Sequence, residues 1–225
     1  MNFLTLDKLV EFSLLELYNT KIMRYLYFLS LVFLFTQCKT QEMAVPVSKS
    51  SEIPYHQIPA YPTTFDAGNV AARMVDGLGY RYYWATKDLR PVDIAYRPSE
   101  DAQDVAGTLK HLYGLSLVVL NATKQQANIR PSKFPEHTYQ QRRQATLENL
   151  KAASDNLKGS SKKDLEQFTV VFQRDTKASE FPFWNLINGP IADAIYHVGQ
   201  IVSFRRTTGN PVQTGVNVFM GKTKE

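Results

Sequence analysis

Apolar residues recur at helical spacing in four segments of the chain, and this periodicity is the feature that most constrains its fold. The four predicted helices span Thr63 to about Leu89, about Asp101 to Ala122, residues 138–159, and Phe183 or Asn185 to Thr207. Loops that contain proline or glycine separate them. The pattern predicts an all-α fold, a four-helix bundle, with "FTVVFQR" (168–174) as a short strand or extended segment before the last helix.

The ends and faces of these helices carry further signals. Thr63 or Thr64 is the predicted cap of the first helix, and Ser161 with Asp164 has the spacing of a capping box. The expected core-facing stripe of the first helix consists of Phe65, Val70, Met74, Leu78 and Tyr82. Gly77 and Gly79 are expected to weaken that helix.

Composition excludes several classes of protein. The chain has 225 residues, of which 44% are hydrophobic and 21% charged, as in an ordinary single globular domain. The net charge is +5, but no long basic run occurs, so nucleic acid is not an expected partner. A single cysteine excludes an internal disulfide framework and a CxxC metal knuckle. Any bound metal ion would therefore need nitrogen and oxygen ligands.

The amino-terminal region has the pattern of an export signal. Arg24 precedes an apolar run from Tyr25 to Phe35, which is shorter than the roughly 20 residues of a membrane-spanning helix. Cys38 follows the run after Thr36 and Gln37, in an arrangement that resembles a bacterial lipoprotein signal with Cys38 as the lipidated residue. A plain secretory signal or an uncleaved anchor is the alternative. We therefore expect export to the cell envelope and attachment to a membrane through a lipid at Cys38 or through the signal segment.

These observations divide the chain into five parts. Acidic residues in the first segment do not fit a signal, whereas Met23 followed by Arg24 would begin one well. The predicted parts are a spurious amino-terminal extension (1–22), the signal peptide (23–38), a flexible tether (39–62), the helical domain (63–211) and a carboxyl-terminal tail (212–225).

The last helix carries a candidate metal site. At about 100° per residue, Asp193, His197 and Gln200 project within about 40° of one direction. A carboxylate and an imidazole one turn apart can hold one cation from the same side. His111, on the apolar stripe of the second helix, is the natural third ligand, and Gln200 is a candidate to orient a ligand. The alternatives are a hydrogen-bonded packing role for His111 and an ordinary charge-assisted pair for Asp193 with His197.

Two motifs carry a resemblance to a known family. "TLKHLYGL" (108–115) and "DAIYHVGQI" (193–201) resemble the signatures of the DinB-like superfamily, which includes YfiT-like proteins and bacillithiol- and mycothiol-dependent transferases. The resemblance implies a four-helix bundle that binds a divalent metal ion through three histidines. His111 and His197 match two of these positions, and the third falls on Asp193. The region from Phe181 resembles lipoprotein-type members of that family.

The resemblance also implies a class of activity. We expect an envelope-anchored, metal-binding protein that acts on a small molecule as a metal-dependent hydrolase or thiol transferase. Zinc, nickel, manganese and iron all accept these ligands. The alternative is a non-catalytic helical binding or interaction module with a weak or lost metal site, because aspartate replaces a histidine at position 193. A homodimer is a further candidate assembly.

Overall fold

The computed structural model describes residues 52–224. The predicted extension (1–22), the signal segment with Cys38 (23–38) and the first part of the tether lie outside the described residues. Within residues 52–224, no helix combines the length and the apolar character needed to cross a membrane.

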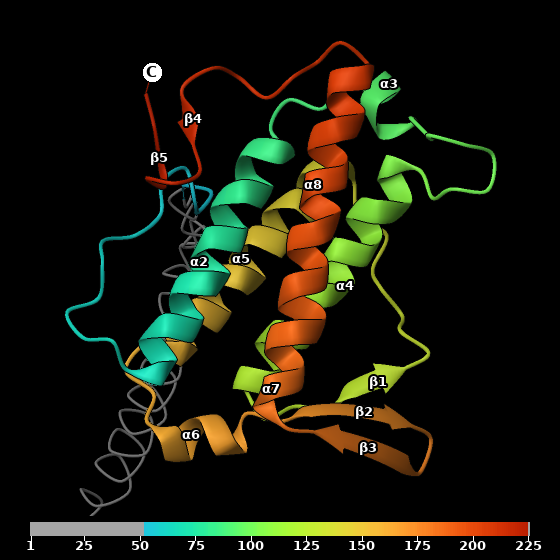
Figure 1. Cartoon of the computed structure of the whole chain (residues 1–225). Helices are drawn as coiled ribbons and strands as arrows, with labels where there is room; N and C mark the ends of the chain where they lie inside the picture. The colour runs from blue at the N-terminus through green and yellow to red at the C-terminus, as the bar shows by residue number, and fades with distance from the viewer. Residues whose placement is uncertain (1–51, 225) are drawn as a thin grey trace, which may run out of the picture. The chain divides into compact units, whose positions relative to one another are not determined.

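Helices make up most of the described chain (Figure 1). The four long helices are α2 (Ala67–Ala85), α4 (Val105–Thr123), α5 (Tyr139–Leu157) and α8 (Ala192–Thr207). Helices α2 and α4 each pack against both α5 and α8. The shorter helices are α3 (Pro91–Ile94), α6 (Lys162–Gln167) and α7 (Phe183–Leu186). The prediction of a mostly helical fold is therefore confirmed.

The helix starts follow capping chemistry in most places. The Asp104 carboxylate accepts a hydrogen bond from the Gly107 amide at 2.8 Å at the start of α4. The predicted capping box of Ser161 and Asp164 is present at the start of α6. The predicted threonine cap of α2 is wrong, because the helix begins at Ala67 and the Thr64 hydroxyl donates to the Asp66 carboxylate instead.

The core-facing side of α2 differs from the predicted stripe. Phe65 is 99% exposed, and Val70 and Met74 are also exposed, whereas Leu78 and Tyr82 are buried. Small residues bring α2 close to its neighbours: a methyl group on Gly68 would lie 2.4 Å from the Leu157 carbonyl oxygen. Apolar spacing alone could not reveal this face, because glycine and alanine add little to an apolar stripe.

Helix α5 buries a thin apolar stripe. Leu147, Leu150 and Leu157 are fully buried in the core, on an otherwise polar helix. Thr138 caps α5, and Gly159 ends the segment with a φ of 72°. Left-handed backbone of this kind favours glycine just after a helix.

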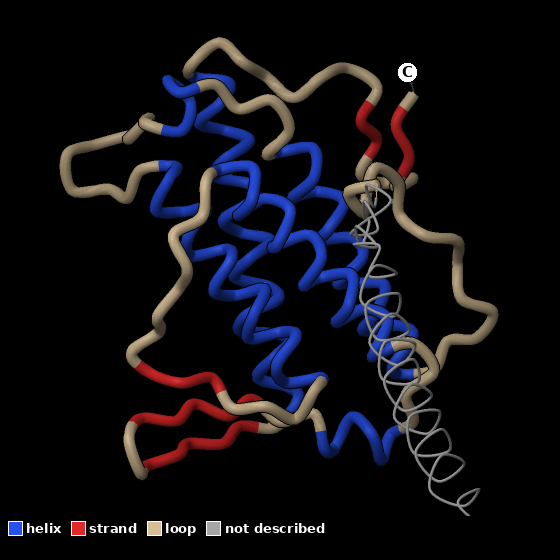
Figure 2. The backbone as a smooth tube through the Cα atoms, turned by 180° about the vertical axis from the view of Figure 1, so that it is seen from behind, coloured by secondary structure: helices blue, strands red, loops and turns tan. Residues whose placement is uncertain are grey.

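Two small sheets complete the fold. Strand β2 (Val170–Arg174) confirms the predicted extended segment and pairs with β1 (Asn128–Arg130) in parallel and with β3 (Lys177–Phe181) antiparallel. This sheet lies at the end of the helices where α8 begins (Figure 2). The hairpin of β4 (Val216–Asn217) and β5 (Lys222–Thr223) lies towards the opposite end.

The described part of the predicted tether is packed, contrary to its polar composition. Tyr55 is buried, and its hydroxyl donates to the Asp76 carboxylate at 3.0 Å. Burial, together with the adjacent Asp76 carboxylate, raises the pKa of the Tyr55 hydroxyl. The Ile58 amide donates to the Gly221 carbonyl oxygen in the carboxyl-terminal hairpin. A few aromatic and aliphatic anchors therefore order a segment that is otherwise rich in polar residues and proline.

Candidate metal centre

Three predicted ligand side chains meet between α4 and α8. The Nε2 atom of His111 lies 3.1 Å from Oδ2 of Asp193, and Nε2 of His197 lies 3.3 Å from Oδ1 of the same carboxylate. The two imidazole rings stand edge to face with centroids 4.7 Å apart. One ligand atom from each residue lies within 4.8 Å of the other two. The structure thus brings His111, Asp193 and His197 together, across 82 residues of sequence in the case of His111 and Asp193.

The position of Asp193 depends on a bend before α8. Helix α7 continues through a π-helical turn, η1 (Ile187–Ile191), in which Gly189 has the non-helical angles φ −95° and ψ −105°. Pro190 follows, and proline within a helix removes a backbone hydrogen bond and favours such a bend. Regular helix resumes at Ala192, so Asp193 lies in its first turn and His197 follows one turn later. Ile191 and Val198 are buried on the other side and hold α8 against its neighbours.

His111 lies at the rim of the α4 core stripe rather than inside it. Its side chain is 42% exposed, although Val118 and Ala122, which lie on the same face of a regular helix, are buried. Leu112, the next residue, points into the core. The prediction of a core-facing histidine is therefore wrong, because the imidazole turns towards Asp193 and His197 of α8 instead. This exposure leaves the ring accessible to solvent.

Gln200 orients the His197 ring. Its Oε1 atom lies 2.7 Å from Nδ1 of His197, and a carbonyl oxygen can only accept, so Nδ1 carries the proton. In the neutral imidazole the lone pair then lies on Nε2, the atom that faces Asp193. The Gln200 amide also donates to the Tyr196 hydroxyl at 3.4 Å. The sequence pattern identifies Gln200 but not Tyr196, although the spacing from 196 to 200 equals that from 193 to 197.

The donor set fits a divalent ion. Two ligand atoms bound tetrahedrally to one zinc ion at about 2.1 Å lie about 3.4 Å apart. The separations of 3.1 Å and 3.3 Å found here join the two Nε2 atoms to different oxygens of the Asp193 carboxylate, and one ligand atom from each residue lies within 4.8 Å of the others. Two imidazoles and one carboxylate suit zinc and several other transition metals. With three protein ligands, coordination positions remain for water or a substrate. The same contacts also suit an aspartate shared by two protonated histidines, so the group could hold a metal ion without requiring one.

The two arginines at the end of α8 have different roles. Arg205 is buried and donates to the carbonyl oxygens of Trp84, Ala85 and Lys87, and thus caps the carboxyl end of α2. Burial lowers the pKa of its guanidinium. Arg206 is exposed. Arg205 therefore serves a neighbouring helix rather than a substrate.

Comparisons with known proteins identify no relative of this chain. The chain matches no protein-family profile, no curated protein and no solved structure. The three converging side chains are consequently the observation on which a function can rest.

Proposed function

We propose that the chain binds one divalent metal ion through His111, Asp193 and His197. The convergence of these side chains from two helices carries the proposal. Their partial exposure supports a site that solvent and small molecules can reach, because the side chains of His111 and Asp193 are each 42% exposed.

We further propose that the four long helices form a bundle of the DinB-like kind. Two observations support this: α4 and α8 supply the ligands, and each packs against other long helices. The motifs "TLKHLYGL" and "DAIYHVGQI" lie in these two helices. Under this proposal the protein is a metal-dependent hydrolase or thiol transferase, exported and anchored to the cell envelope.

The protein's own residues supply positioning. Gln200 fixes the His197 ring with Nε2 directed at the site. Asp193 contributes a negative charge that offsets part of the charge of a divalent cation. A divalent ion bound there would supply Lewis acidity, which lowers the pKa of water or of a thiol. The small-molecule substrate would approach from the exposed side of His111.

A second candidate is a non-catalytic binding module that keeps the helices but binds metal weakly. One observation favours it: Asp193 lies within reach of both histidines, so protonation of the imidazoles could satisfy its charge without an ion. The substitution of aspartate for the histidine of the DinB-like pattern points the same way.

Metal analysis separates these candidates. The purified chain, stripped with a chelator, is dialysed against zinc, nickel, manganese or ferrous ions, and bound metal is measured by elemental analysis. We expect one ion per chain, and an affinity at least about 100-fold lower in Asp193→Asn and His197→Gln. Asp175→Asn, in the exposed turn between β2 and β3, is the matched control and should bind as the wild type does.

A folded wild-type chain that holds no stoichiometric ion would refute the metal proposal and favour the module. Where metal is bound, the loaded chain is tested on ester, amide and thiol substrates. Turnover that Asp193→Asn abolishes would support the enzyme, and its absence across the panel would favour the module.

A further inference from the structure

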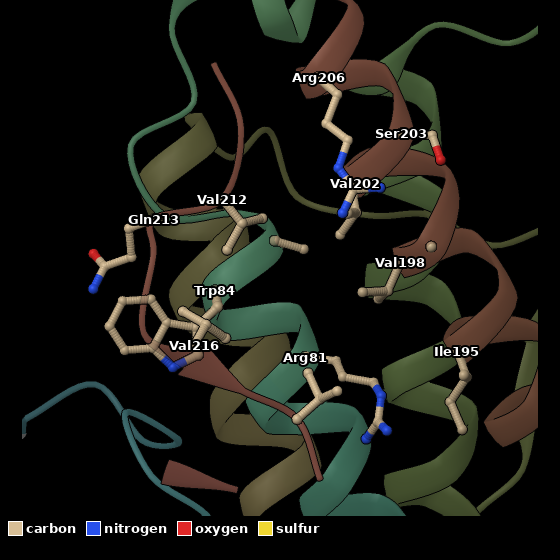
Figure 3. Close-up of a pocket in the computed structure, with 13 residues that line it drawn as sticks. Arg81, Trp84, Ile195, Val198, Val202, Ser203, Arg206, Val212, Gln213 and Val216 are labelled. Carbon is tan, nitrogen blue, oxygen red and sulfur yellow. The ribbon is translucent and has the colours of Figure 1, made fainter. Parts of the chain in front are cut away.

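A cavity lies on the opposite face of α8 from the metal centre. It has a volume of about 550 Å³ and lies between α2, α8 and the carboxyl-terminal segment (Figure 3). Ligand pockets for small molecules commonly have volumes of about 300 to 1,000 Å³. None of the three candidate metal ligands lines it. Size and position therefore make it a candidate site in its own right.

The walls of this cavity are mainly apolar. Its central apolar residues are Trp84 of α2, Ile195, Val198 and Val202 of α8, and Val212 and Val216 of the carboxyl-terminal segment. The Trp84 indole nitrogen is already committed, since it donates to the His56 carbonyl oxygen at 3.2 Å. The Trp84 side chain is 2% exposed and packs against other aromatic rings, so it forms a fixed part of the cavity wall. Such walls suit a hydrocarbon chain or ring.

Two guanidinium groups accompany these apolar walls. Arg81 makes one hydrogen bond, to the Gly77 carbonyl oxygen at 3.1 Å, and Arg206 makes none with its side chain within residues 52–224. In that part of the chain neither arginine pairs with a carboxylate, and no acidic residue lines the cavity. In Figure 3 the Arg206 side chain extends along α8 towards Val202, and Arg81 extends from α2 towards α8. The cavity thus carries positive charge that no described side chain neutralises.

Gly199 keeps the cavity open. It lies in the interior of α8, where glycine costs about 0.5 to 1 kcal/mol relative to alanine. No heavy atom lies within 4 Å of the position that its Cβ would occupy, so packing within the described chain does not require glycine. A larger side chain at position 199 would extend into the cavity that Gly199 lines.

We propose that this cavity binds an amphipathic anion, a carboxylate with a hydrocarbon chain of medium length. The carboxylate pairs with Arg206, because a guanidinium with no partner matches a carboxylate in charge and geometry. The hydrocarbon part of the ligand packs against the apolar wall formed by Trp84 and the valines. Arg81 adds positive electrostatic potential. Binding of this anion does not require the metal centre, because the metal centre lies on the other face of α8.

Trp84 provides a direct readout of this proposal. The sequence contains two tryptophans, and Trp184 is 75% exposed, so Trp184→Phe leaves Trp84 as the only indole at little structural cost. The chain with this substitution is titrated with decanoate, and Trp84 fluorescence is followed. We expect a saturable change in Trp84 fluorescence with decanoate and no change with acetate, which lacks the hydrocarbon chain. 1-Decanol, which lacks the negative charge, should bind at least tenfold more weakly than decanoate.

Two variants locate the binding. Arg206→Gln should weaken decanoate binding by about 10-fold or more, as expected for the loss of a charge-assisted pair. Gly199→Leu should abolish binding by filling the cavity, and circular dichroism checks that the variant remains helical. Asp193→Asn should bind decanoate as the wild type does, so this test and the metal proposal fail independently.

Three results would overturn the inference. The first is the absence of a saturable response to decanoate. The second is equal affinity for decanoate and 1-decanol, which would indicate unspecific apolar adsorption. The third is unchanged binding by a folded Gly199→Leu variant.

Discussion

Helix α8 contributes residues to two polar clusters of opposite character, which α3 and α4 complete. At its carboxyl end, Arg205 and Asp93 are buried, and the Asp93 side chain is 1% exposed. Near its start, His111, Asp193 and His197 are partly exposed. In the first cluster, Asp93 accepts from Arg90, Thr208 and Asn210. In the second, Asp193 has only the two imidazoles as recorded partners within residues 52–224.

The difference separates a structural cluster from a candidate site. Buried polar groups must be fully hydrogen-bonded, because an unpaired one costs about 1 to 3 kcal/mol. The Arg205 and Asp93 cluster meets that demand and leaves little capacity for a ligand. The metal centre keeps donor atoms that solvent can reach, on helices held by buried neighbours. Both clusters contain an aspartate and a cationic partner, so exposure and spare bonding capacity, rather than residue type, distinguish them.

The largest effect is expected from Arg205→Met. The substitution leaves carbonyl oxygens at the end of α2 without donors, and we expect the free energy of unfolding to fall by about 4 kcal/mol. Urea unfolding measures this value. Arg206→Met, at the next position but exposed, should change it by less than about 0.5 kcal/mol. Equal effects of the two substitutions would contradict the structural role of Arg205.

Asp93→Asn should have the next largest effect, with a dependence on pH. The Arg90 guanidinium, with the Thr208 hydroxyl and the Asn210 amide, holds the pKa of Asp93 well below its ordinary value. A carboxylate with a lowered pKa stabilises the fold above its unfolded pKa of about 3.9 and loses that contribution as the pH falls towards the folded pKa. We expect the variant to be about 3 kcal/mol less stable at pH 7. The difference in unfolding free energy between the wild type and the variant should become smaller below about pH 4. A difference that stays constant down to pH 2 would exclude the ionised carboxylate as its source.

A smaller effect is expected at the metal centre from Gln200→Met. The variant removes the acceptor that fixes the His197 ring, so metal affinity should fall by about 10-fold while the unfolding free energy of the metal-free chain stays nearly unchanged. Titration calorimetry measures the affinity. Gln144→Met, which removes the amide that donates to Glu148 on the surface of α5, is the matched control. If both variants bind metal as the wild type does, Gln200 is not a positioning residue.

The smallest effect is a stabilisation. Gly199→Ala should raise the free energy of unfolding by about 0.5 to 1 kcal/mol, because alanine is the better helix former and its methyl group would meet open space. Gly68→Ala should lower it, since the added methyl would lie 2.4 Å from the Leu157 carbonyl oxygen. Thermal unfolding measured side by side tests the pair. A stability loss in both variants would show that position 199 has a packing role.

The sequence predicts some of these features and hides others for identifiable reasons. The pairing of Asp193 with His197 follows from one turn of helix, and the burial of Leu147 and Leu150 follows from their spacing. The meeting with His111 depends on how α4 and α8 pack, which local spacing does not encode. Strand β3 was not predicted because all its residues are exposed and show no apolar alternation.

The role of Arg205 was hidden because its acceptors are main-chain carbonyls, which carry no sequence signal. The described part of the predicted tether was misjudged for a related reason. Tyr55 and Ile58 order that segment through contacts with α2 and the carboxyl-terminal hairpin. These partners are distant in sequence, so composition alone favoured a flexible chain.

The bend at Gly189 and Pro190 sets the rotational phase of everything that follows it on α8. His197 faces His111 on one side of this helix, and Ile195 and Gly199 line the cavity opposite Trp84 on the other. Because α8 is one continuous helix from Ala192 to Thr207, a rotation that separates the two imidazoles also turns the side chains that line the cavity. A change in the backbone angles of Gly189 would therefore alter the geometry of both sites together.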